Sequence, residues 1–118
     1  MAKRRRLSRS GEFDRVYRDG SSQATRHLVL YSFPRREEED DGAVRLGVSA
    51  SRKVGGAVER NRVKRVMREA FWELADRLPP AHDFVLVARP EIAELIEREG
   101  AVGVQASIEE ALAEGRST

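Results

Sequence analysis

The residues best suited to chemistry in this 118-residue chain are the cations of one short segment, residues 60–68. The segment reads Arg-Asn-Arg-Val-Lys-Arg-Val-Met-Arg, with four Arg for one Lys. Guanidinium groups form paired hydrogen bonds with phosphate and stack on nucleobases. They stay protonated at neutral pH and so do not act as nucleophiles or general bases. The segment therefore predicts a surface that binds a polyanion, not a catalytic centre.

These residues fall within an expected helix from about Ala57 to Arg77, which Pro79-Pro80 terminates. At about 100° per residue, the apolar side chains share one arc of this helix and the cations share another. The apolar arc consists of Val63, Val66, Met67, Ala70, Phe71 and Leu74. The predicted contact residues include two cations just before the helix and are Arg52, Lys53, Arg60, Asn61, Arg62, Lys64, Arg65 and Arg68.

A solvated helix surface is the ordinary alternative for these charges. Such a helix usually places Glu and Lys four residues apart, so that they support each other. Here Arg60, Lys64 and Arg68 repeat like charges at that spacing, at a cost of a few tenths (about 0.2–0.5) of a kcal/mol per pair. A nucleic acid would neutralise them and is favoured. Trp72 lies on the basic side of the helix, where it either stacks on a base or, as we expect, packs at a sheet edge.

The distribution of charge agrees with a polyanionic partner for most of the chain. Residues 1–90 carry 20 Lys and Arg against 13 Asp and Glu, whereas residues 91–118 carry two Arg against seven Glu. There is no cysteine, which excludes disulfides and thiolate ligands and fits a reducing cytoplasm. We expect a cytoplasmic protein that does not enter the membrane, because no apolar stretch approaches the roughly 18 residues of a membrane span.

The remaining patterns indicate a single α+β domain, a two-layer sandwich. Strands 28–33 and 44–49 look like a hairpin, and strand 83–88 is expected to pair in parallel with an earlier strand because it follows a helix. Other expected elements are a helix from Ser10 to Asp19, a polar connection at 21–25, an acidic loop at 35–42, and short helices at 91–99 and 107–114 split by Gly100 and Gly103. The expected divisions are a flexible basic arm (1–9), an RNA-binding α/β domain (10–90) and an acidic C-terminal helical segment (91–118).

Residues 51–71 closely resemble the signature of the bacterial ribonuclease P protein subunit. That family has a basic start, a Val-Gly-Asn/Gly-Ala-Val turn, and then Arg-Asn-Arg-x-Lys-Arg with a further Arg downstream; the turn matches residues 54–58 here and the basic motif residues 60–65. A match over about twenty residues with this spacing is far more specific than a short motif. The first helix, the two strands after it and the strand at 83–88 agree as well, so the resemblance covers roughly residues 5–90.

The resemblance implies a fold like domain 2 of ribosomal protein S5, in the order α-β-β(-β)-α-β-α with a left-handed βαβ crossover. It implies binding to a large catalytic RNA and to the 5′ leader of precursor tRNA, the leader lying between the first helix and the sheet. Phe13, Tyr17 and Tyr31 match the aromatic positions of that leader cleft. From the residues alone, Phe13 is equally a core residue, whereas the polar tips of the two tyrosines favour base stacking.

The resemblance also places hydrolysis in the RNA subunit, which requires Mg²⁺, and the protein would lower the magnesium that is needed. We expect no catalytic residue, metal site or cofactor in the protein itself. Neither His27 nor His82 has the spacing of a nucleophile or metal site, and the acidic run Glu37–Asp41 is typical of a solvated loop. Many relatives end in a basic helix, but residues 91–114 are rich in Glu, so we assign no RNA contact there.

Two other functions stay open on the residues alone. One is a structural, ribosomal-type RNA-binding protein without a processing role. The other is a DNA-binding module that places the helix in a major groove, although no helix three or four residues upstream completes a helix-turn-helix, so we expect no DNA partner.

Overall fold

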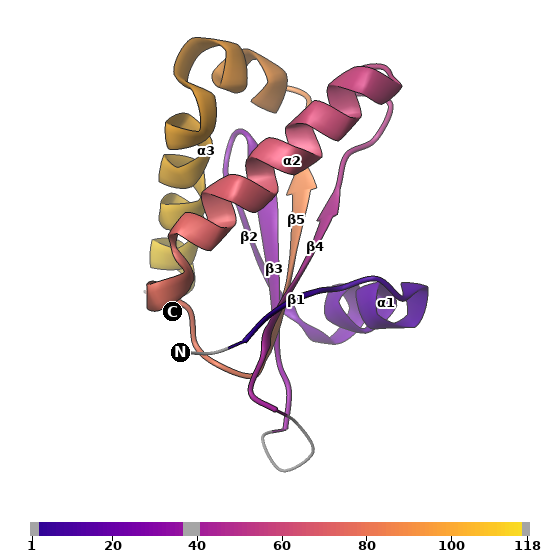
Figure 1. The fold of residues 1–118 in the computed structure, drawn as a ribbon, viewed down its shortest axis with the longest axis vertical. Coiled ribbons are helices and arrows are strands. Elements are labelled where there is room, and N and C mark those ends of the chain that lie inside the picture. The colour runs from indigo at the N-terminus through magenta and orange to yellow at the C-terminus, as the bar shows by residue number, and fades with distance from the viewer. Residues whose placement is uncertain (1–2, 37–40, 117–118) are drawn as a thin grey trace.

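The computed structural model describes residues 3–36 and 41–116 as a mixed α+β fold built on one five-stranded sheet (Figure 1). The elements in chain order are β1 (Arg4–Arg6), α1 (Ser10–Asp19), β2 (Ser21–Ala24), β3 (Leu28–Pro34), β4 (Val44–Ser49), α2 (Ala57–Glu73), the 3₁₀ turn η2 (Ala75–Arg77), β5 (His82–Ala88) and α3 (Ile92–Arg116). The strands lie in the order β1-β4-β5-β3-β2. Within the described ranges, no helix is both long and apolar enough to cross a membrane.

The central strand of the sheet is β5, the last strand in the sequence. It pairs in parallel with β4 and antiparallel with β3, so the expected hairpin between strands 28–33 and 44–49 is wrong. The physical reason is burial. The side chains of β5 are apolar over most of its length and need cover on both faces, which a strand in the middle of the sheet receives from the helices packed on either side. The expected parallel pairing of this strand with an earlier one is confirmed.

Both edges of the sheet are formed by segments that the sequence pattern assigned to irregular structure. Residues 4–6 form β1, parallel to β4, and Leu7 beyond it is buried, so the expectation of a flexible arm is wrong here. Residues 21–24, expected as a connection, form β2 antiparallel to β3. Both strands consist mainly of polar or charged residues, so they lack the alternation of apolar and polar residues that predicts a strand. Such side chains are nevertheless suited to the exposed edges of a sheet.

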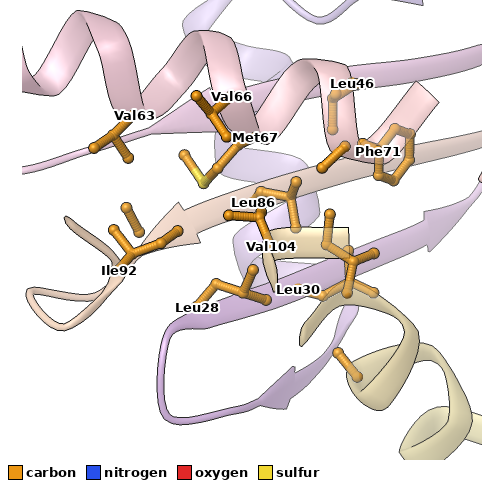
Figure 2. Close-up of a cluster of buried hydrophobic side chains, with 14 of the residues drawn as sticks. Leu28, Leu30, Leu46, Val63, Val66, Met67, Phe71, Leu86, Ile92 and Val104 are labelled. Carbon is orange, nitrogen blue, oxygen red and sulfur yellow. The ribbon is translucent and has the colours of Figure 1, made fainter. Parts of the chain in front are cut away.

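The larger core lies between one face of the sheet and the helices α2 and α3. All six residues of the apolar arc of α2 are buried, as expected. Figure 2 shows Val63, Met67 and Phe71 directed toward the sheet, where they meet Leu28, Leu30, Leu46 and Leu86. The α-helix ends at Glu73, and η2 continues to Arg77, the residue at which the helix was expected to end.

The acidic C-terminal segment belongs to the same core. Its apolar side is buried against the sheet and α2 through Ile92, Leu95, Ile96, Val104, Ile108 and Ala111. The expected break at Gly100 is confirmed, because this residue leaves the helical conformation at φ 65°. The second expected break is wrong: the helix runs through Gly103. A Cβ at Gly103 would press on the side chains of Glu99 and Leu95, so the glycine serves packing instead of ending the helix.

A smaller core on the other face of the sheet corrects the expected two-layer arrangement. Helix α1 packs there through Val16 and Phe13, against Val85 of β5 and Leu7. Helices therefore cover both faces, with α1 on one and α2 and α3 on the other. The alternation along β5 agrees, since Phe84 and Leu86 belong to the larger core and Val85 to the smaller one.

Gly11 within α1 and Gly20 at its C-cap give a matched test of this packing. A Cβ at Gly20 would lie 2.5 Å from the backbone oxygens of Val16 and Ser32, where α1 meets β3, whereas a Cβ at Gly11 meets nothing within 4 Å. We expect Gly20→Ala to lower the free energy of unfolding by about 1–3 kcal/mol. Gly11→Ala, within an exposed helix turn, should raise it by about 0.5 kcal/mol. Urea unfolding of both variants checks this, and equal effects would contradict the close approach at Gly20.

Candidate nucleic-acid interface

The structure divides the cations of α2 into two groups. Arg62 forms an ion pair with Glu59 at 2.8 Å, and Arg65 approaches Glu69 at 3.9 Å. A second group forms no ion pair with any carboxylate in residues 3–36 and 41–115; it consists of Arg60, Lys64 and Arg68. These three are the like charges repeated at i, i+4. They form one unneutralised row along the helix, which we call the basic row.

The two cations before α2 lie in the turn that leads into the helix. Arg52 and Lys53 are exposed, and the turn is closed by backbone hydrogen bonds, including one from the Gly55 N–H to the Arg52 carbonyl at 3.2 Å. Gly55 adopts φ 154°, a conformation that favours glycine. Asn61 is exposed on the first turns of α2. The turn therefore carries the positive surface beyond the start of the helix.

The three aromatic residues predicted for a leader cleft lie together on the α1 side of the sheet. The ring of Tyr17 stands edge-on to Tyr31, with centroids 4.9 Å apart, and lies 6.4 Å from Phe13. Phe13 and Tyr31 are partly buried against the smaller core, whereas Tyr17 is 40 % exposed. Burial raises the pKa of the Tyr17 phenol, with a further rise from Tyr31, so this group is neutral at physiological pH. Phe13 is thus both a core residue and part of this aromatic group.

The aromatic group and the basic row meet at one cavity. Its volume is about 240 Å³, and its lining includes Phe13 from α1, Gly47 from β4, and Lys64 and Arg68 from α2. Gly47 matters here because a Cβ at this position would collide with the ring of Phe13. The absence of a side chain lets the ring lie against β4 and leaves the hollow between α1 and α2 open. Residues from the two predicted sites are therefore brought into one hollow.

Trp72 packs as expected, but it also takes part in this surface. Its ring is partly buried against the larger core and meets Phe71 edge-on at 5.0 Å. The guanidinium of Arg4, from β1, lies over the ring at 5.5 Å from its centroid. The three arginines of β1 are exposed beside α2. They were not predicted as site residues, because residues 1–9 have the composition of a flexible arm.

A buried ion cluster on the α1 face is the second feature that sequence patterns do not reveal. The carboxylate of Asp83, on β5, has no exposed surface and accepts hydrogen bonds from Arg15 of α1, Arg35 after β3 and Arg45 of β4 at 2.6–3.2 Å. Arg45 also donates to Glu12 of α1 at 2.6 Å. The only sign of this cluster in the sequence is Asp83 itself, an acidic residue directly before the apolar residues 84–88. The cluster joins α1 to three positions of the sheet.

The two histidines occupy structural surroundings. His82 stacks on Phe84 with the ring centroids 5.7 Å apart, and its Nδ1 lies 2.8 Å from the carbonyl oxygen of Pro80. The backbone N–H of His27 donates to the Thr25 hydroxyl at 3.2 Å.

In the part of the chain that the structure describes, no three His, Asp or Glu side chains gather as a metal site. Residues 37–40 of the acidic run lie outside the described residues, and Asp41 pairs with Arg5 at 2.6 Å.

Comparison with known proteins decides the family. The family model for ribonuclease P matches residues 1–111. The chain belongs to the ribonuclease P protein family. The ribonuclease P protein component of Shouchella clausii is 43 % identical over 99 residues, which span 84 % of this chain and 79 % of that protein. The component from Bacillus cereus strain B4264 is 39 % identical over 99 residues, 84 % of either chain.

Solved structures of the family have the same fold. The ribonuclease P protein of Staphylococcus aureus superposes with a TM-score of 0.77 at 32 % identity, covering 93 % of this chain and 94 % of that one. The ribonuclease P protein from Thermotoga maritima superposes with a TM-score of 0.76 at 27 % identity, covering 89 % of this chain and 92 % of that one. The family resemblance stated from residues 51–71 is therefore confirmed, and with it a role as a protein component of ribonuclease P.

The buried cluster predicts a strong dependence of stability on Asp83. In Asp83→Asn, the three arginines around this position would remain charged and lose the buried carboxylate between them; the side chain of Arg35 is 5 % exposed. We expect the free energy of unfolding to fall by about 3–5 kcal/mol, as when one partner of a buried ion pair is removed. Urea unfolding measures this. The exposed pair of Asp41 and Arg5 supplies the control, because Asp41→Asn should leave the midpoint nearly unchanged. Equal midpoints for the two variants would contradict the role of Asp83.

Proposed function

We propose that the protein binds the catalytic RNA of ribonuclease P and the 5′ leader of precursor tRNA, and so assists removal of the leader. The observation that carries this proposal is the basic row of unneutralised cations, two of which, Lys64 and Arg68, line the same cavity as Phe13. A polyanion lowers the mutual repulsion of the row, and unstacked bases of a single strand stack on aromatic rings. The leader is single-stranded, so it can use both groups at once.

We further propose that the RNA subunit carries out hydrolysis with Mg²⁺, while the protein contributes charge and position. The support is the type of group at the interface: guanidinium and ammonium groups, an amide and aromatic rings. Such groups screen the repulsion between two RNA molecules and hold a substrate in place. Mg²⁺ supplies charge neutralisation and activation of the attacking water when it is bound by the RNA. A cytoplasmic location would suit a protein that acts on tRNA precursors.

The finer architecture is also a proposal, namely a likeness to domain 2 of ribosomal protein S5 with a left-handed crossover. Its support is the course of the chain in Figure 1. There α2 lies in front of the sheet, and the chain passes from β4 leftward to β5, while both strands run upward in parallel. A right-handed crossover seen from the helix side would move to the right.

The proposed role predicts a change in the magnesium requirement. We expect the catalytic RNA with the protein to cleave a leader-bearing precursor tRNA at a Mg²⁺ concentration where the RNA alone is nearly inactive. The reason is that the protein's cations replace part of the screening by metal ions. Gel analysis of cleavage across a Mg²⁺ series measures this, with the RNA alone at high Mg²⁺ as the control. An unchanged magnesium requirement would refute the proposal.

The division of the α2 cations predicts unequal effects on assembly with the catalytic RNA. In the double variant Arg60→Gln/Arg68→Gln, two unneutralised cations are lost, so the slope of log K against log [salt] should fall by about 2. In Arg62→Gln/Arg65→Gln, the lost cations already have glutamate neighbours, so we expect a smaller fall. Filter binding at several salt concentrations compares these variants of equal net charge. Equal slopes would show that ion pairing within α2 does not select the contacts.

A further inference from the structure

An aromatic residue, Trp72, lies one helical turn beyond the last cation of the basic row. Trp72 follows Arg68 by four residues, as Arg68 follows Lys64 and Lys64 follows Arg60, so all four share one side of the helix. The row from Lys64 to Trp72 extends about 12 Å along the helix axis. Trp72 is held in place by its edge-on contact with Phe71 and by packing on the core. An ordered aromatic ring thus stands at the end of a line of cations.

The edge strand β1 forms a second wall opposite this row. Side chains alternate along a strand, so Arg4 and Arg6 point to the α2 side, while Arg5 points away and pairs with Asp41 at 2.6 Å. In residues 3–36 and 41–115, no carboxylate forms an ion pair with Arg4 or Arg6. The wall therefore presents two further unneutralised cations toward α2.

A cavity of about 190 Å³ lies between these walls, lined by all three arginines of β1 together with Leu46, Arg68 and Trp72. It shares Arg6, Leu46 and Arg68 with the cavity of about 240 Å³ that contains Phe13. The two cavities therefore adjoin, and an extended ligand can pass from the aromatic group of α1 to Trp72 without crossing an acidic residue of either lining.

We propose that this second cavity binds a nucleotide of the 5′ leader, upstream of the leader nucleotides at the aromatic group. The base stacks on Trp72, and Arg6 and Arg68 bind the adjacent phosphates. The exposed side chain of Arg4 turns from the ring to a phosphate, a movement that breaks no ion pair. An aromatic ring beside a positively charged groove is the arrangement by which proteins hold single-stranded nucleic acid without reading its sequence. This inference rests on the proposed function. The leader is the ligand we assign, because the second cavity adjoins the cavity lined by Phe13 of the predicted leader cleft.

Trp72 is the only tryptophan of the chain, so its fluorescence reports on this site directly. Precursor tRNAs with leaders of increasing length would be titrated into the complex of the protein with its catalytic RNA, under conditions where cleavage is blocked. We expect the tryptophan emission to be quenched only when the leader is long enough to pass the aromatic group. An abasic nucleotide at the position that first gives quenching should abolish it. Emission that is the same at every leader length would overturn the proposal.

Substitutions then separate this site from the rest of the interface. Trp72→Leu and Arg4→Gln should remove most of the affinity gained on lengthening the leader, which we expect to be roughly tenfold. Trp72→Phe keeps an aromatic face and should retain much of that gain. Arg98→Gln is the control, because Arg98 is an exposed cation of α3 with glutamate neighbours and lines neither cavity. Circular dichroism and thermal unfolding verify that each variant is folded.

The outcomes distinguish this inference from the proposed function. If precursor tRNA binds more tightly than leaderless tRNA, but the gain with leader length is the same in Trp72→Leu as in the unaltered protein, only the inference fails. If the protein does not favour a leader at any length, the proposed function fails. A loss of assembly with the catalytic RNA in the absence of precursor, equal for Trp72→Leu and Trp72→Phe, would assign the site to that RNA and also overturn the inference.

Discussion

Four segments of the chain meet at one buried carboxylate, that of Asp83. It accepts hydrogen bonds from arginines on α1, after β3 and on β4, while itself belonging to β5. A buried carboxylate is tolerated only when it is well paired, so stability of the fold depends on bringing arginines of these segments to it. This requirement fixes α1 against the sheet at a defined position. The aromatic group is carried partly by α1 and partly by β3, and its geometry depends on that position. The arginines that pair with Asp83 and stabilise the fold are thus different residues from the cations of the basic row, which we propose bind RNA.

The separation of paired from unpaired cations runs through the whole molecule. Arg15, Arg35 and Arg45 form ion pairs with Asp83, and Arg62 with Glu59. The basic row and two arginines of β1 have no ion-pair partner among the described residues. A net charge of +2 conceals this arrangement. Among the described acidic residues, Asp83, Glu12 and Glu59 pair with arginines inside the fold, and further glutamates lie on α3, whose apolar side is occupied by the core. The surface between α1, α2 and β1 is left positive, and this is the surface where the two adjoining cavities lie.

What could be predicted from the sequence is what neighbouring residues determine. The apolar arc and the cationic arc of α2 follow from helical periodicity, and the family follows from residues 51–71, which are contiguous. The place of β5 between β3 and β4 depends on pairing between distant segments, which the alternation of a single strand does not encode. Asp83 breaks the rule that buried strand positions are apolar, so its partners could not be inferred. Arg4 and Arg6 were missed because an edge strand of three arginines has the composition of a disordered arm.

The central position of β5 also sets the order in which the protein can form during its synthesis. The strands β1, β3 and β4 leave the ribosome first, yet β3 and β4 each pair with β5, and they do not pair with each other. Until residues 82–88 are available, the nascent chain holds two separate sheet fragments with open inner edges. The completed sheet then brings together Asp83 and its arginines in the same step that joins the fragments. Translation through Ala88, the last residue of β5, therefore precedes assembly of any part of the interface that spans both fragments.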